Sequence, residues 1–197
     1  MICYFRWEDI SISRQTVYDN TFTKPPSLGW MFMPLVDYEG GGSAAVFEPL
    51  QQNLKPYSFG LAQYLGGGVA ACYRGYRLYD SKDTRDQVFK WVTFYKKYRE
   101  VLGGDIIHIK RPTMQGLDAW LHINPNGHYK GLVMVFNPSS ATISRPLSVS
   151  LYYTGLVKTA LISEGGQEWR QQHLSRDYKV VLEIKLEPVS LTYFIIK

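Results

Sequence analysis

The chain has 197 residues, of which 45% are hydrophobic, and a formal net charge of +5. This length allows one domain or two small ones, and the hydrophobic fraction excludes a disordered chain. The positive charges are spread along the sequence without a basic tail, so the pattern gives no support for nucleic-acid binding. The two cysteines, Cys3 and Cys72, are too few for a disulfide framework and lack the spacing of a metal site.

Hydrophobic stretches, the N-terminal residues and the aromatic content further limit the class of protein. No stretch reaches the roughly 18 apolar residues that a membrane span requires. The N-terminal residues MICYFRWEDI lack the apolar core of a signal peptide, because charges begin at Arg6, and the compartment stays open. The 15 Tyr and 5 Trp residues are an excess, and their flat apolar faces with polar edges suit sugars, stacked bases or protein partners.

The first half of the chain is typical of an α/β fold. A short helix is expected from Ser13 in SISRQTVYDNTF. The apolar run from Leu28 to Val36 has the length of a strand that is buried on both faces, as in a parallel sheet. A helix is expected from Pro56 to Leu65 and a second buried strand from Val69 to Tyr73. This order of strand, helix and strand predicts a parallel sheet.

The clearest predicted helix runs from Asp83 to Leu102. Its apolar residues recur at spacings of three and four, which places them on one stripe. Asp83 is the expected N-cap of this helix and Gly103 its C-cap, while Gly66 is the expected C-cap of the preceding helix.

The hydrophobic period changes to about two residues after Gly104. Turn residues separate eight short alternating runs: DIIHIKR, LDAWLHIN, GLVMVFNP, PLSVSLYY, VKTALIS, EWRQQHL, YKVVLEIKLE and VSLTYFIIK. Such runs predict an antiparallel β-sandwich of about eight strands, with no helix in this half. We therefore expect an α/β domain over residues 1–103, followed by an all-β domain over residues 104–197.

The α/β half is too short for a complete (β/α)8 barrel, which needs about 250 residues. Two or three parallel strands alone would leave an exposed edge. Residues 1–103 are therefore expected to be the C-terminal portion of a barrel, incomplete in this chain.

One junction carries a family resemblance. The segment WVTFYKKYREVLGGDIIHIKRP resembles the link between barrel and C-terminal sandwich in α-galactosidase-type glycoside hydrolases of the melibiase clan, where a Tyr-Lys pair precedes an Arg; the matching residues are Tyr95, Lys96 and Arg99. The runs GLDAWLHIN and KGLVMVFNP resemble the next strands of that clan. LGWMFMPLVDYEGGG and ACYRGYRLYD resemble late barrel strands.

The resemblance implies a glycoside hydrolase acting on carbohydrate, with catalytic aspartates on earlier barrel strands. No matching motif occurs in this chain, so no catalytic residue is assigned from the family. The implied partners are carbohydrate and the missing barrel portion or another chain. The four histidines stand at unrelated spacings, so neither a metal nor another cofactor is expected.

The remaining candidates are polar residues at predicted strand ends. Asp37 and Glu39 form a close carboxylate pair beside glycines, and residues i and i+2 of a strand share a face. They are weak candidates for catalysis, which needs two carboxyl groups, and candidates for binding sugar; a polar strand end before a turn is the structural alternative. Tyr38 lies between them.

Three further residues complete the predicted sugar site. Tyr73 and Arg74 end the second predicted strand, and Trp7 in RWED is positioned to stack on a sugar ring. Two other interpretations remain open. One is a non-catalytic sandwich that binds carbohydrate or protein through residues such as Trp120 or Trp169. The other is a folded remnant of a degenerate reading frame.

Overall fold

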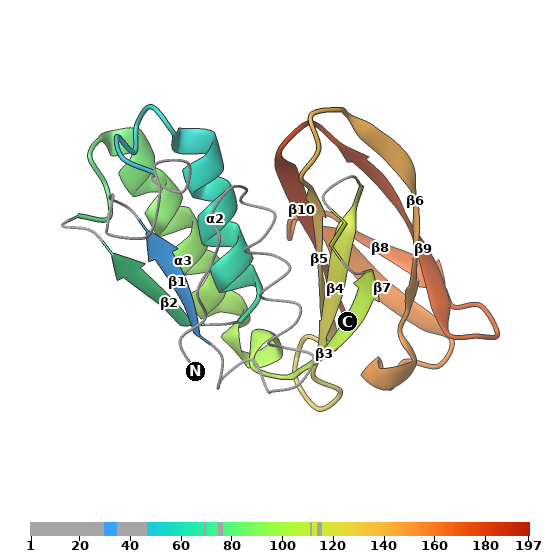
Figure 1. Cartoon of the computed structure of the whole chain (residues 1–197). Coiled ribbons are helices and arrows are strands. Elements are labelled where there is room, and N and C mark those ends of the chain that lie inside the picture. Colours follow the sequence, from blue (N-terminus) through green and yellow to red (C-terminus); the bar gives the residue numbers. More distant parts are fainter. Residues whose placement is uncertain (1–29, 35–46, 69, 75–76, 111, 114–115) are drawn as a thin grey trace. The chain divides into compact units, whose positions relative to one another are not determined.

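The computed structural model describes residues 30–34, 47–68, 70–74, 77–110, 112–113 and 116–197. The chain divides into two compact units, Met1–Lys97 and Tyr98–Lys197. In chain order the described elements are β1 (Trp30–Pro34), α2 (Leu54–Gly66), β2 (Ala70–Arg74), α3 (Lys82–Leu102), β3 (Asp105–Lys110), β4 (Asp118–Ile123), β5 (Gly131–Asn137), β6 (Ile143–Ser150), η3 (Tyr152–Thr154), β7 (Thr159–Glu164), β8 (Trp169–His173), β9 (Lys179–Leu186) and β10 (Ser190–Ile196) (Figure 1).

The first unit contains the predicted parallel strands. β1 and β2 pair in parallel, with Trp30 opposite Ala70 and Pro34 opposite Arg74, and α2 connects them in sequence. This confirms the strand, helix and strand order. α2 ends at Gly66, one residue beyond the expected end, and Gly67 is its C-cap. The short helix expected from Ser13 lies outside the described residues.

The side chain of Ser58 on α2 links this helix to α3 by hydrogen bonds. Trp91 Nε1 on α3 donates a hydrogen bond of 3.0 Å to Ser58 Oγ on α2. Ser58 Oγ in turn donates to Gln87 Oε1 at 2.7 Å. The buried indole of Trp91 thus has a partner for its N–H, as a buried tryptophan usually requires.

The N-terminus of α3 differs from the sequence-based expectation. Asp83 lies inside the first turn and is not the N-cap. Ser81 caps the helix instead: its Oγ accepts from the Thr84 N–H at 3.3 Å, and the Ser81 N–H donates to Thr84 Oγ1 at 3.0 Å. This reciprocal pair has the form of a capping box, with threonine in place of the usual Glu or Gln.

The second unit is a β-sandwich. One sheet has six strands in the order β3-β4-β5-β10-β7-β8, and the other contains β6 and β9. All pairs within both sheets are antiparallel. Each of the eight alternating sequence runs overlaps one of these strands, so the predicted number of about eight strands is confirmed.

One short helix was not expected in this half. The η3 turn, Tyr152–Thr154, follows β6 directly and ends at Gly155, whose φ is 79°. The run PLSVSLYY therefore leaves the strand conformation at its two tyrosines. Thr154 Oγ1 donates to the Leu151 carbonyl at 2.6 Å and closes the turn.

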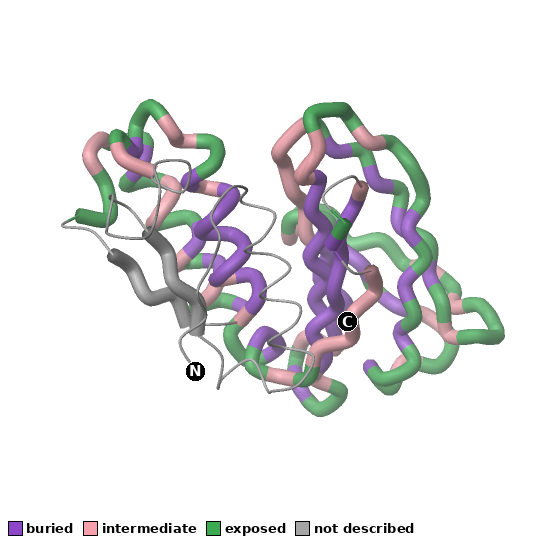
Figure 2. Tube along the Cα trace, in the orientation of Figure 1, coloured by how far each residue is buried: buried purple, intermediate pink, exposed green. Residues whose placement is uncertain are grey.

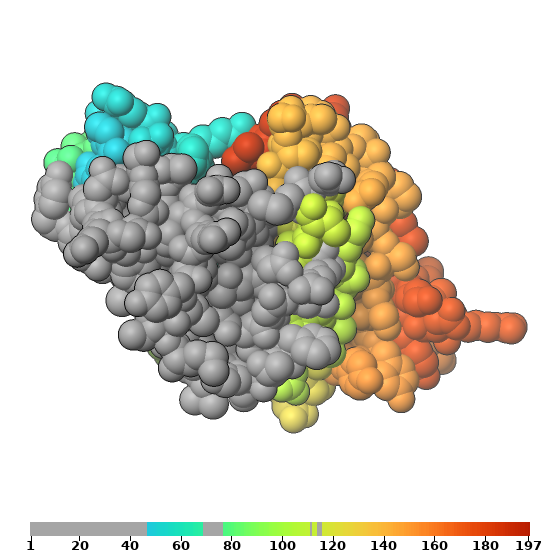
Figure 3. Space-filling view, viewed as in Figure 1, coloured from blue at the N-terminus to red at the C-terminus, as the bar shows by residue number. Residues whose placement is uncertain are grey.

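The sandwich core follows the two-residue period. β9 alternates between exposed and buried at every position, and its buried residues Val180, Leu182, Ile184 and Leu186 enter the core (Figure 2). In Figure 3 the yellow-orange β6 lies at the surface of the molecule, in agreement with its mostly exposed residues.

The central strands of the six-stranded sheet are buried on both faces. Every residue of β4 and β5 is buried, although only alternate ones belong to the core between the sheets. The opposite face contains Trp120, Met134 and Phe136, and the rings of Trp120 and Phe136 lie 4.9 Å apart. The same face also contains the buried polar side chains of Asp118 and His122, so it combines aromatic and polar groups.

The glycine pair between α3 and β3 has a packing cause. A Cβ on Gly104 would lie 2.0 Å from the Ile123 carbonyl oxygen at the end of β4. Gly103 donates its N–H to the Arg99 carbonyl at 2.9 Å, as expected for a residue that ends the helix. Only a residue without a side chain lets the backbone of Gly104 approach β4 this closely.

Candidate functional site

The predicted sugar-site residues fall mostly outside the described part of the chain. This holds for Trp7, Asp37, Tyr38 and Glu39. Tyr73 and Arg74 are the last two residues of β2, opposite Met33 and Pro34 of β1. Because the strands are parallel, the segments that follow them leave the sheet at the same edge, where parallel α/β folds form their sites.

The described parts of these two segments are joined by an ion pair. Arg77, in the segment after β2, donates from Nε and Nη2 to the two carboxylate oxygens of Glu48 at 2.9 and 2.8 Å. Glu48 lies before α2, in the segment after β1. The Glu48 side chain is 11% exposed and that of Arg77 39%. Two parallel hydrogen bonds fix the guanidinium in one orientation, which a single contact would not do.

Asp80 extends this connection. Its Oδ2 accepts from the Gln51 backbone N–H at 3.0 Å, and its Oδ1 accepts from Thr84 Oγ1 at 3.1 Å. Arg77 Nη2 lies 3.9 Å from Oδ2. Burial acts to raise the pKa of Asp80, but the hydrogen bonds and the charge of Arg77 outweigh it and lower the pKa below 3.8.

Glu48, Arg77 and Asp80 therefore form a clamp between the two segments, which we call the loop clamp. Both carboxylates already accept hydrogen bonds from protein groups, so they are poor candidates for proton transfer to a substrate. Their effect is to join the described residues just before α2 to those just before α3. Sequence reasoning missed them because the ion-paired residues are 29 positions apart.

An aromatic side chain lies exposed next to the clamp. Tyr79 is 51% exposed, and Leu78 beside it is 37% exposed. The Leu78 carbonyl accepts a hydrogen bond of 2.6 Å from Tyr57 Oη on α2, which fixes the backbone of this segment. Tyr79 thus presents an exposed ring from a backbone that is held in place.

The two tryptophans of the binding-module interpretation have different environments. Trp120 is 1% exposed, so it is a packing residue and not a surface for ligand. Trp169 is 38% exposed. Its ring is parallel to that of Tyr129 within 4°, with centroids 6.5 Å apart, and Lys197 Nζ lies 4.5 Å from the Trp169 centroid. Of the two tryptophans named for the binding-module interpretation, Trp169 alone has an accessible aromatic surface.

Two negative findings concern the described residues alone. Within the part of the chain that the structure describes, no group of three His, Cys, Asp or Glu residues is arranged to hold a metal ion. The same described residues include no helix that is both long and apolar enough to cross a membrane.

Comparison with known proteins gives a result for structure but not for sequence. Neither the protein-family models nor the curated proteins include a match to this sequence. Among solved structures, the galactosidase domain of an α-galactosidase–sucrose kinase is similar over 96% of this chain, with a TM-score of 0.64 and 17% identity. A GH36 α-galactosidase from Geobacillus stearothermophilus is similar over 96% of the chain, with a TM-score of 0.63 and 14% identity.

A third similar structure belongs to another glycosidase family. It is a GH27 β-L-arabinopyranosidase from Geobacillus stearothermophilus, matched over 98% of this chain with a TM-score of 0.59 and 14% identity. This chain spans 25%, 24% and 42% of the lengths of the three proteins. The chain therefore shares the fold of part of these α-galactosidase-type glycosidases, in agreement with the architecture that the family resemblance implies.

Proposed function

We propose that this chain is the C-terminal part of a glycoside hydrolase that acts on carbohydrate. Residues 1–103 would be the end of a (β/α)8 barrel and would supply part of the wall of the sugar site. Residues 104–197 would be the sandwich that supports the barrel. Without the earlier barrel strands, the chain would not hydrolyse glycosides.

The observation that carries this proposal is the order of elements. Two parallel strands, each followed by a helix, precede an eight-stranded sandwich, and solved glycosidases contain this arrangement within longer chains.

The sugar-site wall would include Asp37, Tyr38 and Glu39 after β1, Tyr73 and Arg74 at the end of β2, and Trp7. The loop clamp supports this part of the proposal because Glu48 and Arg77, which come later in the segments that follow β1 and β2, are hydrogen-bonded to each other. Neutral carbohydrate is the proposed ligand, and the remaining barrel would be supplied by an upstream region or a second chain.

The DNA upstream of Met1 tests the proposal. We expect an in-frame region, or an adjacent reading frame, that encodes alternating strands and helices with paired aspartates at strand ends. If the upstream and neighbouring DNA encodes no such region, the hydrolase proposal is wrong. The alternative, a non-catalytic sandwich that binds carbohydrate or protein, is then favoured.

A further inference from the structure

The sandwich contains a cleft of its own, at the place where its two sheets end. β8 is an edge strand of the six-stranded sheet, and among the described strands β9 pairs with β6 alone. Between them is a cavity of about 260 Å³. Its floor consists of Ile162, Leu182 and Phe194, which are all at most 5% exposed.

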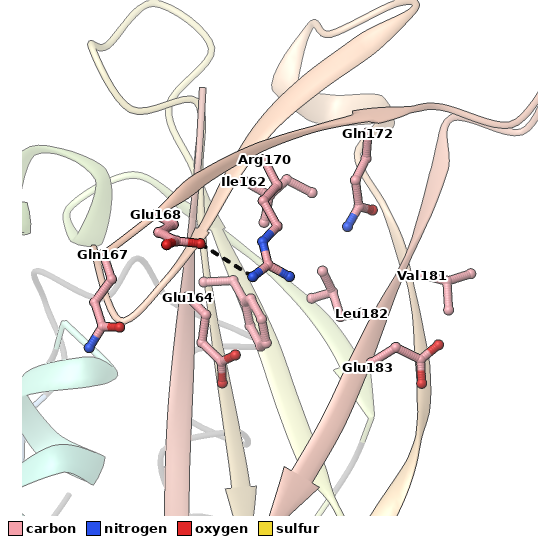
Figure 4. Close-up of a pocket in the computed structure, with 10 residues that line it drawn as sticks. Ile162, Glu164, Gln167, Glu168, Arg170, Gln172, Val181, Leu182 and Glu183 are labelled. Carbon is pink, nitrogen blue, oxygen red and sulfur yellow. Dashed lines mark hydrogen bonds and ion pairs between the residues drawn. The ribbon is translucent and has the colours of Figure 1, made fainter.

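The rim of this cleft is polar on both sides. Figure 4 shows Arg170 of β8 reaching into the opening, with Glu164 and Glu168 near it and Glu183 of β9 on the opposite side. Gln172, two residues beyond Arg170 on the same strand, also lines the cleft. Hydrogen-bond donors and acceptors therefore surround an apolar floor.

The rim contains one fixed carboxylate and one loose ion pair. Thr192 Oγ1 donates to Glu164 Oε1 at 2.7 Å, so this carboxylate has a fixed position with its second oxygen still able to accept. Arg170 Nη2 lies 3.4 Å from Glu168 Oε2. That ion pair is highly exposed, so it contributes little to stability and is readily rearranged around a ligand.

The charge of the lining is opposite to that of the whole chain. Glu164, Glu168 and Glu183 supply three carboxylates, and Arg170 supplies the one cation of the lining, whereas the chain carries +5 overall. A bound anion would therefore meet like charges at close range, which costs binding free energy. The lining therefore disfavours uronic acids and sulfated sugars relative to an uncharged sugar.

We infer that the β8–β9 cleft binds an uncharged sugar ring. A pyranose has a rim of hydroxyl groups, which the polar side chains of the cleft can bind. Those hydroxyls would donate to Glu164 and Glu183 and accept from Arg170 and Gln172. The volume is slightly below the ~300–1,000 Å³ of pockets for drug-sized ligands, which suits a single ring.

This inference goes beyond the proposed hydrolase function, because the cleft lies entirely in the sandwich. It holds whether or not the chain belongs to a hydrolase. Sugar binding measured at β8 and β9 does not depend on glycoside turnover or on the residues after β1 and β2. The sugar-cleft inference and the hydrolase proposal can therefore fail separately.

The test is a ¹⁵N-labelled NMR titration of the full chain with three monosaccharides of different charge. Methyl α-D-galactopyranoside is the neutral probe, galacturonate the anion and galactosamine the cation. We expect the neutral sugar to shift amide signals of β8 and β9 with a Kd in the ~1 mM range. Galacturonate should bind at least tenfold more weakly, as like-charge repulsion requires.

Variants with matched controls assign the shifts to the cleft. Arg170→Gln and Glu183→Gln should each weaken binding of the neutral sugar about tenfold, since each removes a charge-assisted hydrogen bond. Arg176→Gln and Asp177→Asn change exposed charges outside the lining and should leave the Kd unchanged. All four positions are exposed, so the variants should fold.

Four results would overturn the inference. They are an absence of shifts at β8 and β9, binding of galacturonate as tight as that of the neutral sugar, binding of galactosamine alone, and loss of affinity in the control variants as large as in the cleft variants. Shifts of β9 amides that grow with protein concentration in the absence of sugar would show strand addition between copies, which also contradicts a sugar cleft.

Discussion

Arg77 donates two hydrogen bonds to Glu48 and thereby joins the segment after β2 to the segment before α2. These segments follow neighbouring parallel strands. The pair is therefore located where an α/β fold builds its binding site, but it consists of residues that satisfy each other. Its function in our account is to position that site.

A double-mutant cycle on Arg77→Gln and Glu48→Gln tests the strength of the clamp. We expect a coupling energy of about 1 kcal/mol in urea unfolding, because the pair is bidentate and one partner is largely buried. Arg77→Lys should lose most of it, since an ammonium group cannot make the two-point contact.

The exposed pair of Lys82 and Asp86 on α3 is the control for this cycle. It has a similar distance of 2.8 Å, but its side chains are 84% and 56% exposed. Its coupling should be clearly smaller than that of Arg77 and Glu48, because solvent screens an exposed i,i+4 pair. A coupling for Arg77 and Glu48 no larger than this would mean that the clamp does not hold the segments.

Asp80 should make the stability of the first unit depend on pH in acid. Its folded pKa lies below the ordinary value of 3.8, so the carboxylate stabilises the fold above pH 3.8 and this contribution is lost as pH falls through the lower folded pKa. Asp80→Asn should remove this part of the acid dependence. The check is urea unfolding of both proteins from pH 6 downwards; identical profiles would contradict the assignment.

Gly104→Ala should destabilise the sandwich strongly. The added Cβ would lie 2.0 Å from the Ile123 carbonyl oxygen, and backbone must move to relieve the clash. We expect a loss of about 1–3 kcal/mol in urea unfolding. Gly116→Ala is the control, because its Cβ would meet only the ends of the Arg145 and Lys110 side chains, at 3.4 and 3.9 Å. Equal losses in the two variants would refute the close approach as the cause.

Asn137 ties the two sheets of the sandwich together. It is fully buried at the end of β5, and its Nδ2 donates to the carbonyls of Leu186 and Glu187, at the end of β9, at 3.1 and 2.9 Å. Its Oδ1 accepts from the Ser139 N–H at 3.0 Å. This is the Asn that ends the run KGLVMVFN, one of the runs that carry the family resemblance.

Asn137→Asp should therefore be costly although the side chains have the same shape. A carboxylate would turn an oxygen toward carbonyl oxygens in place of the amide donor, which should cost at least ~2 kcal/mol in thermal or urea unfolding. Asn126→Asp, at an exposed position, should have little effect. A cost below 1 kcal/mol for Asn137→Asp would show that the sheets do not depend on this link.

The sequence was sufficient for the strands of the sandwich, because a two-residue period interrupted by turn residues has few other solutions. It was less informative about helix ends. Ser81 and Asp83 are both good N-cap residues, and the choice of Ser81 depends on its reciprocal hydrogen bonds with Thr84. Trp120 could not be classified either, since burial on both faces of β4 is not visible in the alternation alone.

The loop clamp could not be predicted from the sequence, for a different reason. The three residues Glu48, Arg77 and Asp80 have ordinary sequence surroundings, and only the parallel pairing of β1 and β2 places their segments at one edge. Contacts between distant positions follow from topology and not from local pattern. The assignment of Asp37 and Glu39 to the sugar-site wall stays a prediction.

The central claim is tested most directly by glycoside turnover with and without the rest of the barrel. The purified chain, alone and joined to the barrel region that the proposal expects upstream, is incubated with 4-nitrophenyl α-galactoside and with the corresponding glucoside, and release of nitrophenol is followed. The account predicts no turnover by the chain alone and clear turnover by the joined protein. Reproducible turnover by the chain alone, or none by the joined protein on aryl galactosides and glucosides, would contradict it.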